Sequence, residues 1–487
     1  MVKRALASLV LGALGACTDE IIVAPVIDLP AATSDANPFP SLDQLELKLG
    51  IEGSDDVLFT ALVGRGEPLE LRGVPYSERL VLHMTGRIGN SEVAYGRTCP
   101  FAIRAGQAAP RPHLYFSRTV LWAESAMPNE PVRVGGATAM YHDGSGMFIG
   151  GTGENAAPLT AVERFNPSTG AFELVGQLTA RKDAQVAVLG DGRVLIAGGL
   201  DAATSQPAPY LELIELDTPE RRVERFPAAS LALTGLALAA LPDGRVFSFG
   251  GADPQGVRGR TIEISNDGAG ISVRTLNASL TTPRRDHSAV RLSDADGAPV
   301  LITGGLDAAN NPVAQAELFR PLQDSYAQPA QFAPAMVVPR RGHQTARLAD
   351  DSVIVLGGIG ANGLPVTTVE LFSFDRGFVA AGELPPDAGV TGQSITTLAD
   401  RRLLVTGGLG ASGLPVDTSY IVRIDPVDGK VDLIGTDSLA TPRAGHAATL
   451  LCDGTVLLVG GTAGASTSER YNPPPSGRRA TGVTTAR

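Results

Sequence analysis

Residues 456–461 read VLLVGG, four apolar residues followed by two glycines. Runs of this kind recur at intervals of 48 to 54 residues, and the β-branched residues before the glycines favour buried strands. A regular internal period of about 50 residues is typical of a repeat architecture with one small sheet per repeat. The seven doublets are Gly150-Gly151, Gly198-Gly199, Gly250-Gly251, Gly304-Gly305, Gly357-Gly358, Gly407-Gly408 and Gly460-Gly461.

Further strands of each repeat can be read around the doublet. An Asp-Gly turn before most apolar runs accommodates the positive φ angles of a tight hairpin, so the first two strands are antiparallel neighbours. Downstream of the doublet, a Glu-x-aromatic step indicates a third strand, although repeat two offers only Ile214-Glu215-Leu216-Asp217 there. The turns are Asp143-Gly144, Asp191-Gly192, Asp243-Gly244, Asp296-Gly297 and Asp453-Gly454, replaced by Asp350-Asp351 and Asp400-Arg401 in repeats five and six. The third-strand steps are Glu163/Phe165, Glu317/Phe319, Glu370/Phe372 and Glu469/Tyr471.

The doublet, the Glu-x-aromatic step and a following Arg-x-Gly-His together resemble the Kelch repeat over residues 133–473. This resemblance implies an all-β fold with a seven-bladed Kelch-type β-propeller, as in galactose-oxidase-type proteins. Repeats two, three and six depart from the third-strand pattern, so the pattern does not predict where their individual strands end.

Closure of the ring can also be predicted. The last repeat ends near Tyr471, and residues 474–487 contain no strand-like run, so we expect them to be a disordered tail. Residues 118–124 (RTVLWAE) form an apolar segment just before the first repeat. We expect this segment to supply the missing fourth strand, so that the propeller spans residues 118–473 without an unpaired edge. The alternative is that it is the last strand of the preceding domain.

A smaller domain precedes the repeats. Residues 38–116 lack doublets and contain short alternating segments such as Leu45-Glu-Leu-Lys-Leu49, which suit half-buried antiparallel strands. We expect a small β-sandwich of Ig-like or carboxypeptidase-regulatory-like type, and neither type implies a ligand. The expected strands are residues 44–49, 57–63, 68–73, 79–84, 92–96 and 101–104.

The first residues read as a targeting signal. Lys3 and Arg4 precede an apolar stretch at residues 5–14, which is too short for a membrane span and has the order of a signal peptide. Its end, Leu14-Gly15-Ala16-Cys17, resembles the bacterial lipobox, and this resemblance implies lipidation of Cys17. We therefore expect a signal peptide at residues 1–17 and a flexible tether at residues 18–37. The alternative is an ordinary secretory peptide with a chance cysteine.

Composition limits the partners and cofactors. The net charge of −11 argues against binding to a nucleic-acid backbone. Besides Cys17, only Cys99 and Cys452 are present; they could pair in an oxidising compartment, but spacing alone cannot decide this. The sequence has no zinc-type Cys-x-x-Cys or His-x-x-x-His spacing, and we expect no metal and no cofactor.

A set of charged residues recurs before the first strand of the repeats. When the repeats are aligned on their doublets, five arginines share one position and three histidines share another. A polar ring at this rim could bind an anion or a metal, or each side chain could bond a neighbouring backbone or third-strand Glu. Repetition favours the second, structural interpretation. The residues are Arg133, Arg181, Arg284, Arg340 and Arg443, with His287, His343 and His446.

No catalytic residue is nominated from the sequence. Copper radical oxidases of the galactose-oxidase type crosslink a Tyr to a Cys, and neither Cys99 nor Cys452 falls on the rim that carries the histidines. The leading hypothesis is a non-catalytic, monomeric lipoprotein of a bacterial cell envelope, at the outer membrane or cell surface rather than the inner membrane. Its propeller would bind an envelope protein or glycan, and only its lipid anchor would touch the membrane. The alternative is a secreted carbohydrate-active or oxidase-like enzyme that uses the propeller rim.

Overall fold

The structure is a computed structural model that describes residues 21–54, 56–64, 67–217, 222–266, 270–328, 330, 332–425, 429–462 and 468–475. The expected signal peptide with Cys17 and residues 476–487 of the expected tail lie outside these ranges. Strands and turns dominate the described part, and its short 3-10 helices are η1 (Phe39–Ser41), η2 (Glu154–Ala156) and η3 (Ala229–Leu231). No helix in these ranges is long and apolar enough to cross a membrane.

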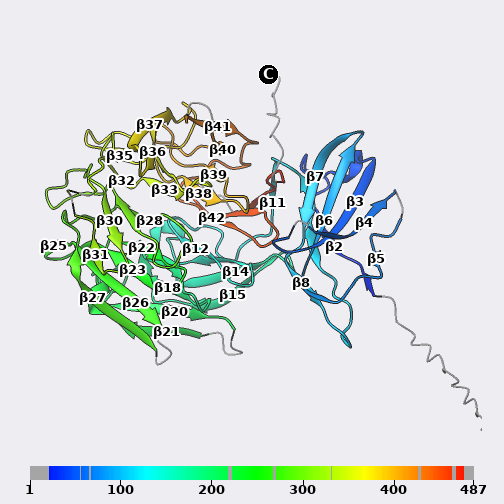
Figure 1. The fold of residues 1–487 in the computed structure, drawn as a ribbon, viewed down its shortest axis with the longest axis horizontal. Helices are drawn as coiled ribbons and strands as arrows, with labels where there is room; N and C mark the ends of the chain where they lie inside the picture. Colours follow the sequence, from blue (N-terminus) through cyan, green and yellow to red (C-terminus); the bar gives the residue numbers. More distant parts are fainter. Residues whose placement is uncertain are drawn as a thin grey trace, which may run out of the picture.

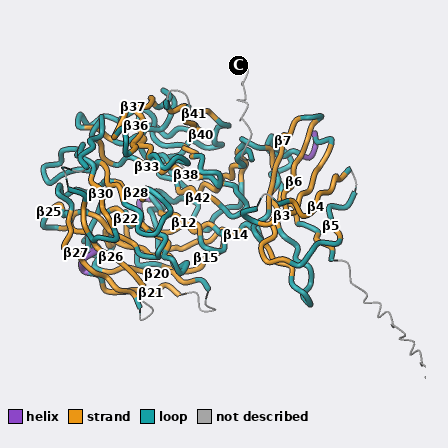
Figure 2. The backbone as a smooth tube through the Cα atoms, viewed as in Figure 1, coloured by secondary structure: helices purple, strands orange, loops and turns teal. Residues whose placement is uncertain are grey.

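Seven four-stranded antiparallel sheets form a ring, beside which the smaller N-terminal domain lies (Figures 1 and 2). Blade one consists of β12 (Ala137–Met140), β13 (Gly146–Ile149), β14 (Ala161–Asn166) and β15 (Ala171–Gln177). Blade two consists of β17 (Gln185–Val188), β18 (Val194–Ala197), β20 (Tyr210–Glu215) and β21 (Arg222–Pro227). Blade three consists of β22 (Ala237–Ala240), β23 (Val246–Phe249), β26 (Arg260–Asn266) and β27 (Ile271–Ser279). Blade four consists of β28 (Ser288–Arg291), β29 (Val300–Thr303), β30 (Glu317–Arg320) and β31 (Ser325–Tyr326). Blade five consists of β33 (Gln344–Arg347), β34 (Val353–Leu356), β36 (Thr368–Ser373) and β37 (Gly377–Glu383). Blade six consists of β38 (Ser394–Thr397), β39 (Leu403–Thr406), β40 (Ser419–Ile424) and β41 (Val431–Gly435).

Blade seven closes the ring with a strand from the other end of the repeat array. Its strands are β42 (Ala447–Leu450), β43 (Val456–Val459), β44 (Glu469–Tyr471) and β11 (Trp122–Glu124). Strand β11 pairs antiparallel with β44, with Trp122 opposite Tyr471. The Trp122 indole donates a hydrogen bond to Ser419 Oγ in blade six (2.9 Å), so this side chain links the closing strand β11 of blade seven to blade six. The expected all-β fold with a seven-bladed β-propeller is confirmed.

Only the second half of the proposed closing segment enters the propeller. Ser117–Arg118 forms β10, which pairs with β7 of the N-terminal domain. Val120 then adopts a positive φ of 61°. The chain turns at this point because β10 and β11 belong to different sheets. Both interpretations of the 118–124 segment therefore hold in part, since its start belongs to the first domain and its end to the ring.

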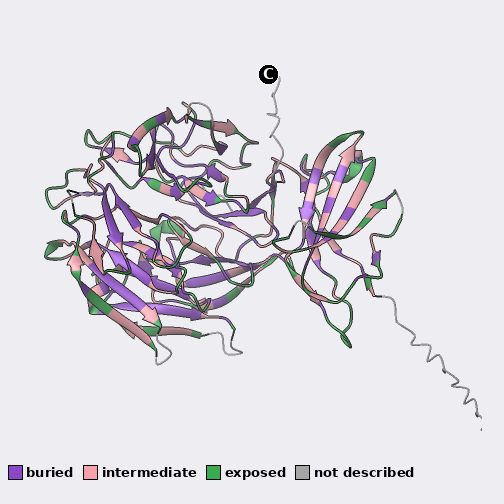
Figure 3. Ribbon diagram, in the orientation of Figure 1, coloured by how far each residue is buried: buried purple, intermediate pink, exposed green. Residues whose placement is uncertain are grey.

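The glycine doublets are required by their backbone conformation and by close contacts around them. Both residues of every doublet have positive φ, the region that favours glycine. A Cβ on Gly407 would lie 2.4 Å from the Arg443 carbonyl oxygen, and a Cβ on Gly304 2.4 Å from the His343 ring, both in the next blade. The apolar run before each doublet is fully buried between blades (Figure 3). In blades two to seven the first glycine of the doublet therefore lies against the next blade, and in every blade the second glycine lies against the entry loop of its own blade.

The N-terminal domain has two layers around one core. Its main sheet has the order β10-β7-β6-β3-β4, and β8 pairs with β6. Two small sheets, β1 with β5 and β2 with β9, pack on the same core. These strands are β1 (Ile22–Val23), β2 (Val26–Asp28), β3 (Gln44–Ile51), β4 (Val57–Val63), β5 (Leu71–Arg72), β6 (Ser77–Ile88), β7 (Ser91–Arg97), β8 (Phe101–Ile103) and β9 (His113–Tyr115).

The expected tether at residues 18–37 is wrong for its described part. Strand β1 pairs with β5, and β2 runs parallel to β9. The Val23 side chain is fully buried in the domain core. The apolar residues at 21–27 (IIVAPVI) supply the small sheets with core-facing side chains, so this stretch folds with the domain instead of linking it.

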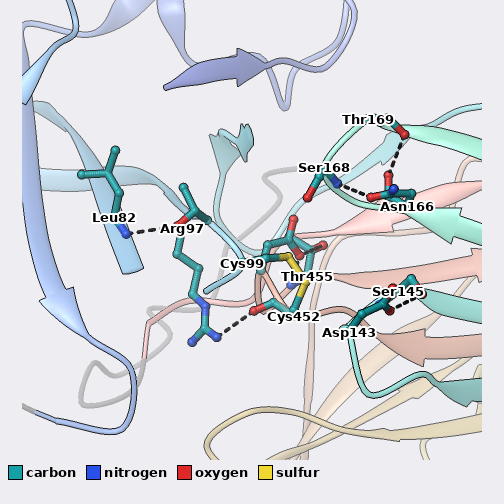
Figure 4. The surroundings of a disulfide bond; sticks show 12 residues. Leu82, Arg97, Cys99, Asp143, Ser145, Asn166, Ser168, Thr169, Cys452 and Thr455 are labelled. Carbon is teal, nitrogen blue, oxygen red and sulfur yellow. Dashed lines mark hydrogen bonds between the residues drawn. A yellow bond between two sulfur atoms is a disulfide. The ribbon is translucent and has the colours of Figure 1, made fainter. Parts of the chain in front are cut away.

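The two domains are joined covalently and by hydrogen bonds at the closing blade. Cys99 and Cys452 form a disulfide, so the pairing that spacing could not decide is present (Figure 4). Arg97 Nη2 donates to the Cys452 carbonyl oxygen (2.7 Å), and Asn472 Nδ2 donates to the Tyr95 carbonyl oxygen (2.6 Å). The N-terminal domain is thus attached at the seam where the ring closes.

Candidate functional site

The five rim arginines are buried inside the blades. Each guanidinium pairs with a glutamate on the third strand of its own blade, as the structural interpretation expected. In blade five, Arg340 Nη2 lies 2.6 Å from Glu370 Oε1, and both side chains are fully buried. The other pairs are Arg133–Glu163, Arg181–Glu212, Arg284–Glu317 and Arg443–Glu469.

Each pair fastens the loop that enters the blade to the doublet. Arg340 Nη1 donates to the Gly357 carbonyl oxygen (3.1 Å), which belongs to the first glycine of the doublet. Glu370 accepts hydrogen bonds from the backbone amides of Val337 and Val338. Burial lowers the pKa of the Arg340 guanidinium, while the Glu370 carboxylate favours its charged form. The rim arginines and their glutamates are buried and bonded to each other, although Arg133 Nε and Arg181 Nε have no hydrogen-bond partner among the described residues. The structure therefore corrects the idea of an exposed arginine ring.

Blades three and six replace the charged pair with other groups. Leu233 and Ile262 occupy the two positions in blade three, and both are fully buried. Val390 and Tyr420 occupy them in blade six, where the Tyr420 hydroxyl donates to Asp387 Oδ1 (2.8 Å). The Arg–Glu pair is therefore one of several solutions to the same packing problem.

The glutamate of blade two was missed by the sequence reading. The Glu215 step proposed there lies three residues past the real partner, Glu212, which binds Arg181. In blades one, four and five the glutamate follows the first glycine of the doublet by 13 residues, and Glu212 follows it by 14. This spacing would have selected Glu212 over Glu215.

The three histidines are also buried structural groups. His343 Nε2 lies 3.0 Å from Thr303 Oγ1, and His446 Nε2 lies 2.9 Å from Thr406 Oγ1, in each case across a blade boundary. Blade three has Phe249 at the corresponding position, so His287 meets no hydroxyl there. Burial, together with the neighbouring arginines, lowers the pKa of all three imidazoles to about 3, so the rings are neutral at pH 7. Among the described residues, no group of three or more His, Cys, Asp or Glu side chains could hold a metal.

The entry to the first strand is a backbone ring with few side chains. The residue two places after each rim arginine, or its equivalent, has positive φ in all seven blades. Gly445 N–H donates to the Gly392 carbonyl oxygen (2.8 Å), and Gly135 N–H donates to that of Gly445 (2.7 Å). The seven residues are Gly135, Asp183, Gly235, Asp286, Gly342, Gly392 and Gly445. Five of them lack a side chain, and the longer loops that follow the doublets lie around this ring.

Those loops form what we call the doublet face, the side of the propeller on which each second strand ends in Gly-Gly. In blades five and six they have closely matching sequences, GANGLPV at residues 360–366 and GASGLPV at residues 410–416. Leu364 and Leu414 are 60% and 65% exposed. The doublet face therefore carries two solvent-exposed leucines on adjacent blades.

Comparison with known proteins gives a likeness in fold only. No protein-family model matches the chain, and no curated protein matches it. The solved structure titled "Structure of YjhT" is similar over 59% of this chain and 93% of that chain, with 15% sequence identity and a TM-score of 0.44.

Proposed function

We propose that this protein is a non-catalytic binding protein whose doublet face docks a partner protein in a bacterial cell envelope. A lipid on Cys17 anchors it there, as in a Kelch-repeat lipoprotein. The exposed leucines on adjacent blades are the observation that carries the docking proposal. The commitment of the repeated arginines and histidines to buried contacts supports binding over catalysis.

The leucine loops are ordered, so exposure of the leucines is not a result of loose structure. Gly360 N–H donates to the Leu364 carbonyl oxygen (2.9 Å), and Gly410 N–H donates to that of Leu414 (2.9 Å). The proline after each leucine forms an isolated bridge back to the end of the doublet segment. The docking proposal therefore rests on two apolar side chains that ordered hairpins of the same sequence type hold in water on adjacent blades.

Sister blades show that the loop does not need a leucine to form. Blades one, two and four have the same proline bridge, and the residue before the proline is Ala157, Gln206 or Asn311. Because a small or polar residue suffices there, the two leucines serve something outside the loop. A protein is the partner that best fits exposed aliphatic side chains. Glycan contacts rely on aromatic and polar groups; the two tips have no aromatic residue, and their polar side chains, Asn362 and Ser412, accept hydrogen bonds from the amides of Leu364 and Leu414.

We expect Leu364→Asn with Leu414→Asn to weaken binding of the partner at least about tenfold. Burying a leucine contributes about 1.5–3 kcal/mol, and 1.4 kcal/mol is a factor of ten in Kd. Envelope proteins captured by the soluble chain without residues 1–17 would be compared between wild type and variant, and the affinity of the captured protein measured.

Leu322→Asn provides a matched control. Leu322 is 68% exposed, but it follows the third strand of blade four and thus lies on the opposite face. It should leave capture unchanged. Equal capture and equal affinity with the double variant would contradict docking on the doublet face.

The anchor is supported by the lipobox and by the disulfide. Structural disulfides persist in oxidising compartments such as the periplasm and the cell surface, and Cys99–Cys452 is of this kind. We expect Cys17→Ser to block processing and abolish labelling by a clickable palmitate analogue, because the thiol that carries the lipid is gone. Cys99→Ser with Cys452→Ser serves as the control that keeps Cys17, and it should still be labelled. Labelling of Cys17→Ser would contradict the anchor.

A further inference from the structure

A cleft of about 240 Å³ lies where the N-terminal sheet meets the turns of blades six and seven. It is on the side of the propeller opposite the doublet face, because Asp400 and Gly454 belong to the turns between first and second strands. The N-terminal domain contributes His83, Tyr95 and Arg97 to its lining. The disulfide and the Arg97–Cys452 contact hold the two walls together beside the cleft (Figure 4).

Arg97 gives the cleft an uncompensated positive charge. Its Nη2 donates to the Cys452 carbonyl oxygen, and its buried Nε has no hydrogen-bond partner among the described residues. Within the same residues, no carboxylate lies within ion-pair distance of Arg97. A cation of this kind in a cleft at a domain boundary favours an anionic ligand.

The carboxylates that line the cleft are already neutralised by other arginines. Asp453 pairs with the buried Arg470 and also accepts a hydrogen bond from Thr455 Oγ1 (2.7 Å). Asp400 pairs with Arg402 (2.6 Å). The charged groups of the lining, counted together with the buried Arg470 behind Asp453, therefore sum to about +1, and Arg97 is the cation without a carboxylate partner, which suits a monoanion.

A neutral hydrogen-bonding pair lies beside this charge. His83 Nδ1 and the Tyr95 hydroxyl are 2.6 Å apart. Burial lowers the pKa of His83 to about 4 and raises the pKa of Tyr95 to about 12, so both groups are uncharged at pH 7. Neutral donors and acceptors of this kind are suited to ligand hydroxyls.

Part of the remaining wall is apolar. Leu398, Ala399 and the prolines at 473–475 form this part, and Arg402, Gly454 and Asn472 complete the lining. The volume is below the range of about 300–1,000 Å³ that is usual for drug-sized ligands, so the occupant must be compact. An apolar wall facing polar groups matches a sugar ring, which has one apolar face and hydroxyls at its edge.

We propose that the interdomain cleft binds a compact sugar acid, with Arg97 holding its carboxylate and His83 and Tyr95 contacting its hydroxyls. This site is independent of the docking surface on the doublet face, and failure of either proposal leaves the other standing. The chemistry specifies a hexuronate-sized monoanion and excludes the corresponding neutral sugar.

D-glucuronate and D-glucose are the probes, because they differ by the carboxylate alone. Histidine ring resonances of the disulfide-intact full chain would be followed by NMR during titration with each sugar. We expect saturable shifts confined to His83 with glucuronate and none with glucose up to tens of millimolar. No shift with glucuronate, or equal shifts with both sugars, would overturn the proposal.

Arg97→Gln tests the role of the cation. We expect it to weaken glucuronate binding at least tenfold, whereas Arg222→Gln, which removes an exposed arginine from the outer strand β21, should not change it. Because Arg97 also contacts Cys452, Arg97→Lys is the second variant, which keeps the charge and should bind more tightly than Arg97→Gln. Unchanged affinity in Arg97→Gln would overturn the assignment.

Discussion

A chain that begins at Ser125 is expected to unfold at least about 5 °C below a chain that begins at Thr119. Both lack the N-terminal domain and the disulfide, and they differ by residues 119–124, which contain strand β11. Without β11, strand β44 becomes an unpaired edge and Tyr471 loses the Trp122 ring, whose centroid lies 4.9 Å away. Loss of a buried Trp costs about 3–5 kcal/mol by itself, and the backbone pairing adds to this.

Thermal unfolding of the two purified chains, followed by circular dichroism, measures the difference. The expected loss is a large fraction of the roughly 5–15 kcal/mol that stabilises an ordinary domain, so the shorter chain should also unfold less cooperatively. Trp122→Ala in the longer chain should reproduce most of the effect. Equal melting temperatures for the two chains would show that the ring is held without the closing strand.

The sequence was sufficient for the ring because the features that build it repeat. Each doublet ends a buried second strand and has positive φ at both glycines, so a run such as VLLVGG carries the same information seven times. Closure by residues near Trp122 could be inferred for the same reason. The seventh repeat has no fourth strand of its own, and the strand-like segment at residues 118–124 belongs to no repeat. The point at which the chain leaves the first domain, near Val120, could not, because it depends on pairing between β10 and β7.

Features that occur once were harder to predict. The disulfide and the interdomain cleft combine residues more than 300 positions apart, such as Arg97 and Cys452, and no local pattern announces such a contact. The strand at Val23 was taken for a tether because short strands with prolines between them resemble a linker in composition. The exposed Leu364 and Leu414 are visible in the sequence, but an apolar residue before a proline reads equally well as buried.

The rim positions were predicted as a set, but their environment was not. An Arg and a Glu that recur at aligned positions can form an exposed ring of charges or a buried ion pair in each blade. The alignment of the repeats does not show whether the two side chains are buried. Arg340 and Glu370 prove to be fully buried. Polar residues at a repeated position are therefore weak evidence for a ligand site when their blades could pair them with each other.

The buried pair also gives the second large prediction, which concerns blade five. Glu370→Ile is expected to destabilise the protein by about 3–5 kcal/mol, because Arg340 is left buried without an anion. Adding Arg340→Leu should recover at least about 1 kcal/mol, because the unpaired cation is removed and Leu and Ile are the residues that blade three uses at these positions. Full recovery is not expected, because the amides of Val337 and Val338 lose their acceptor in both variants.

Urea unfolding of the wild type, the two single variants and the double variant completes the thermodynamic cycle. The buried pair is shielded from solvent, so the coupling energy should be nearly the same in low salt and in 0.5 M NaCl, a concentration at which exposed pairs are largely screened. Arg222→Leu on the exposed strand β21 is the control and should change stability by less than about 0.5 kcal/mol. If Glu370→Ile and the double variant were equally unstable, the destabilisation would come from the amides of Val337 and Val338 that lost their acceptor. Burial of the unpaired Arg340 would then cost nothing measurable, which would contradict the prediction.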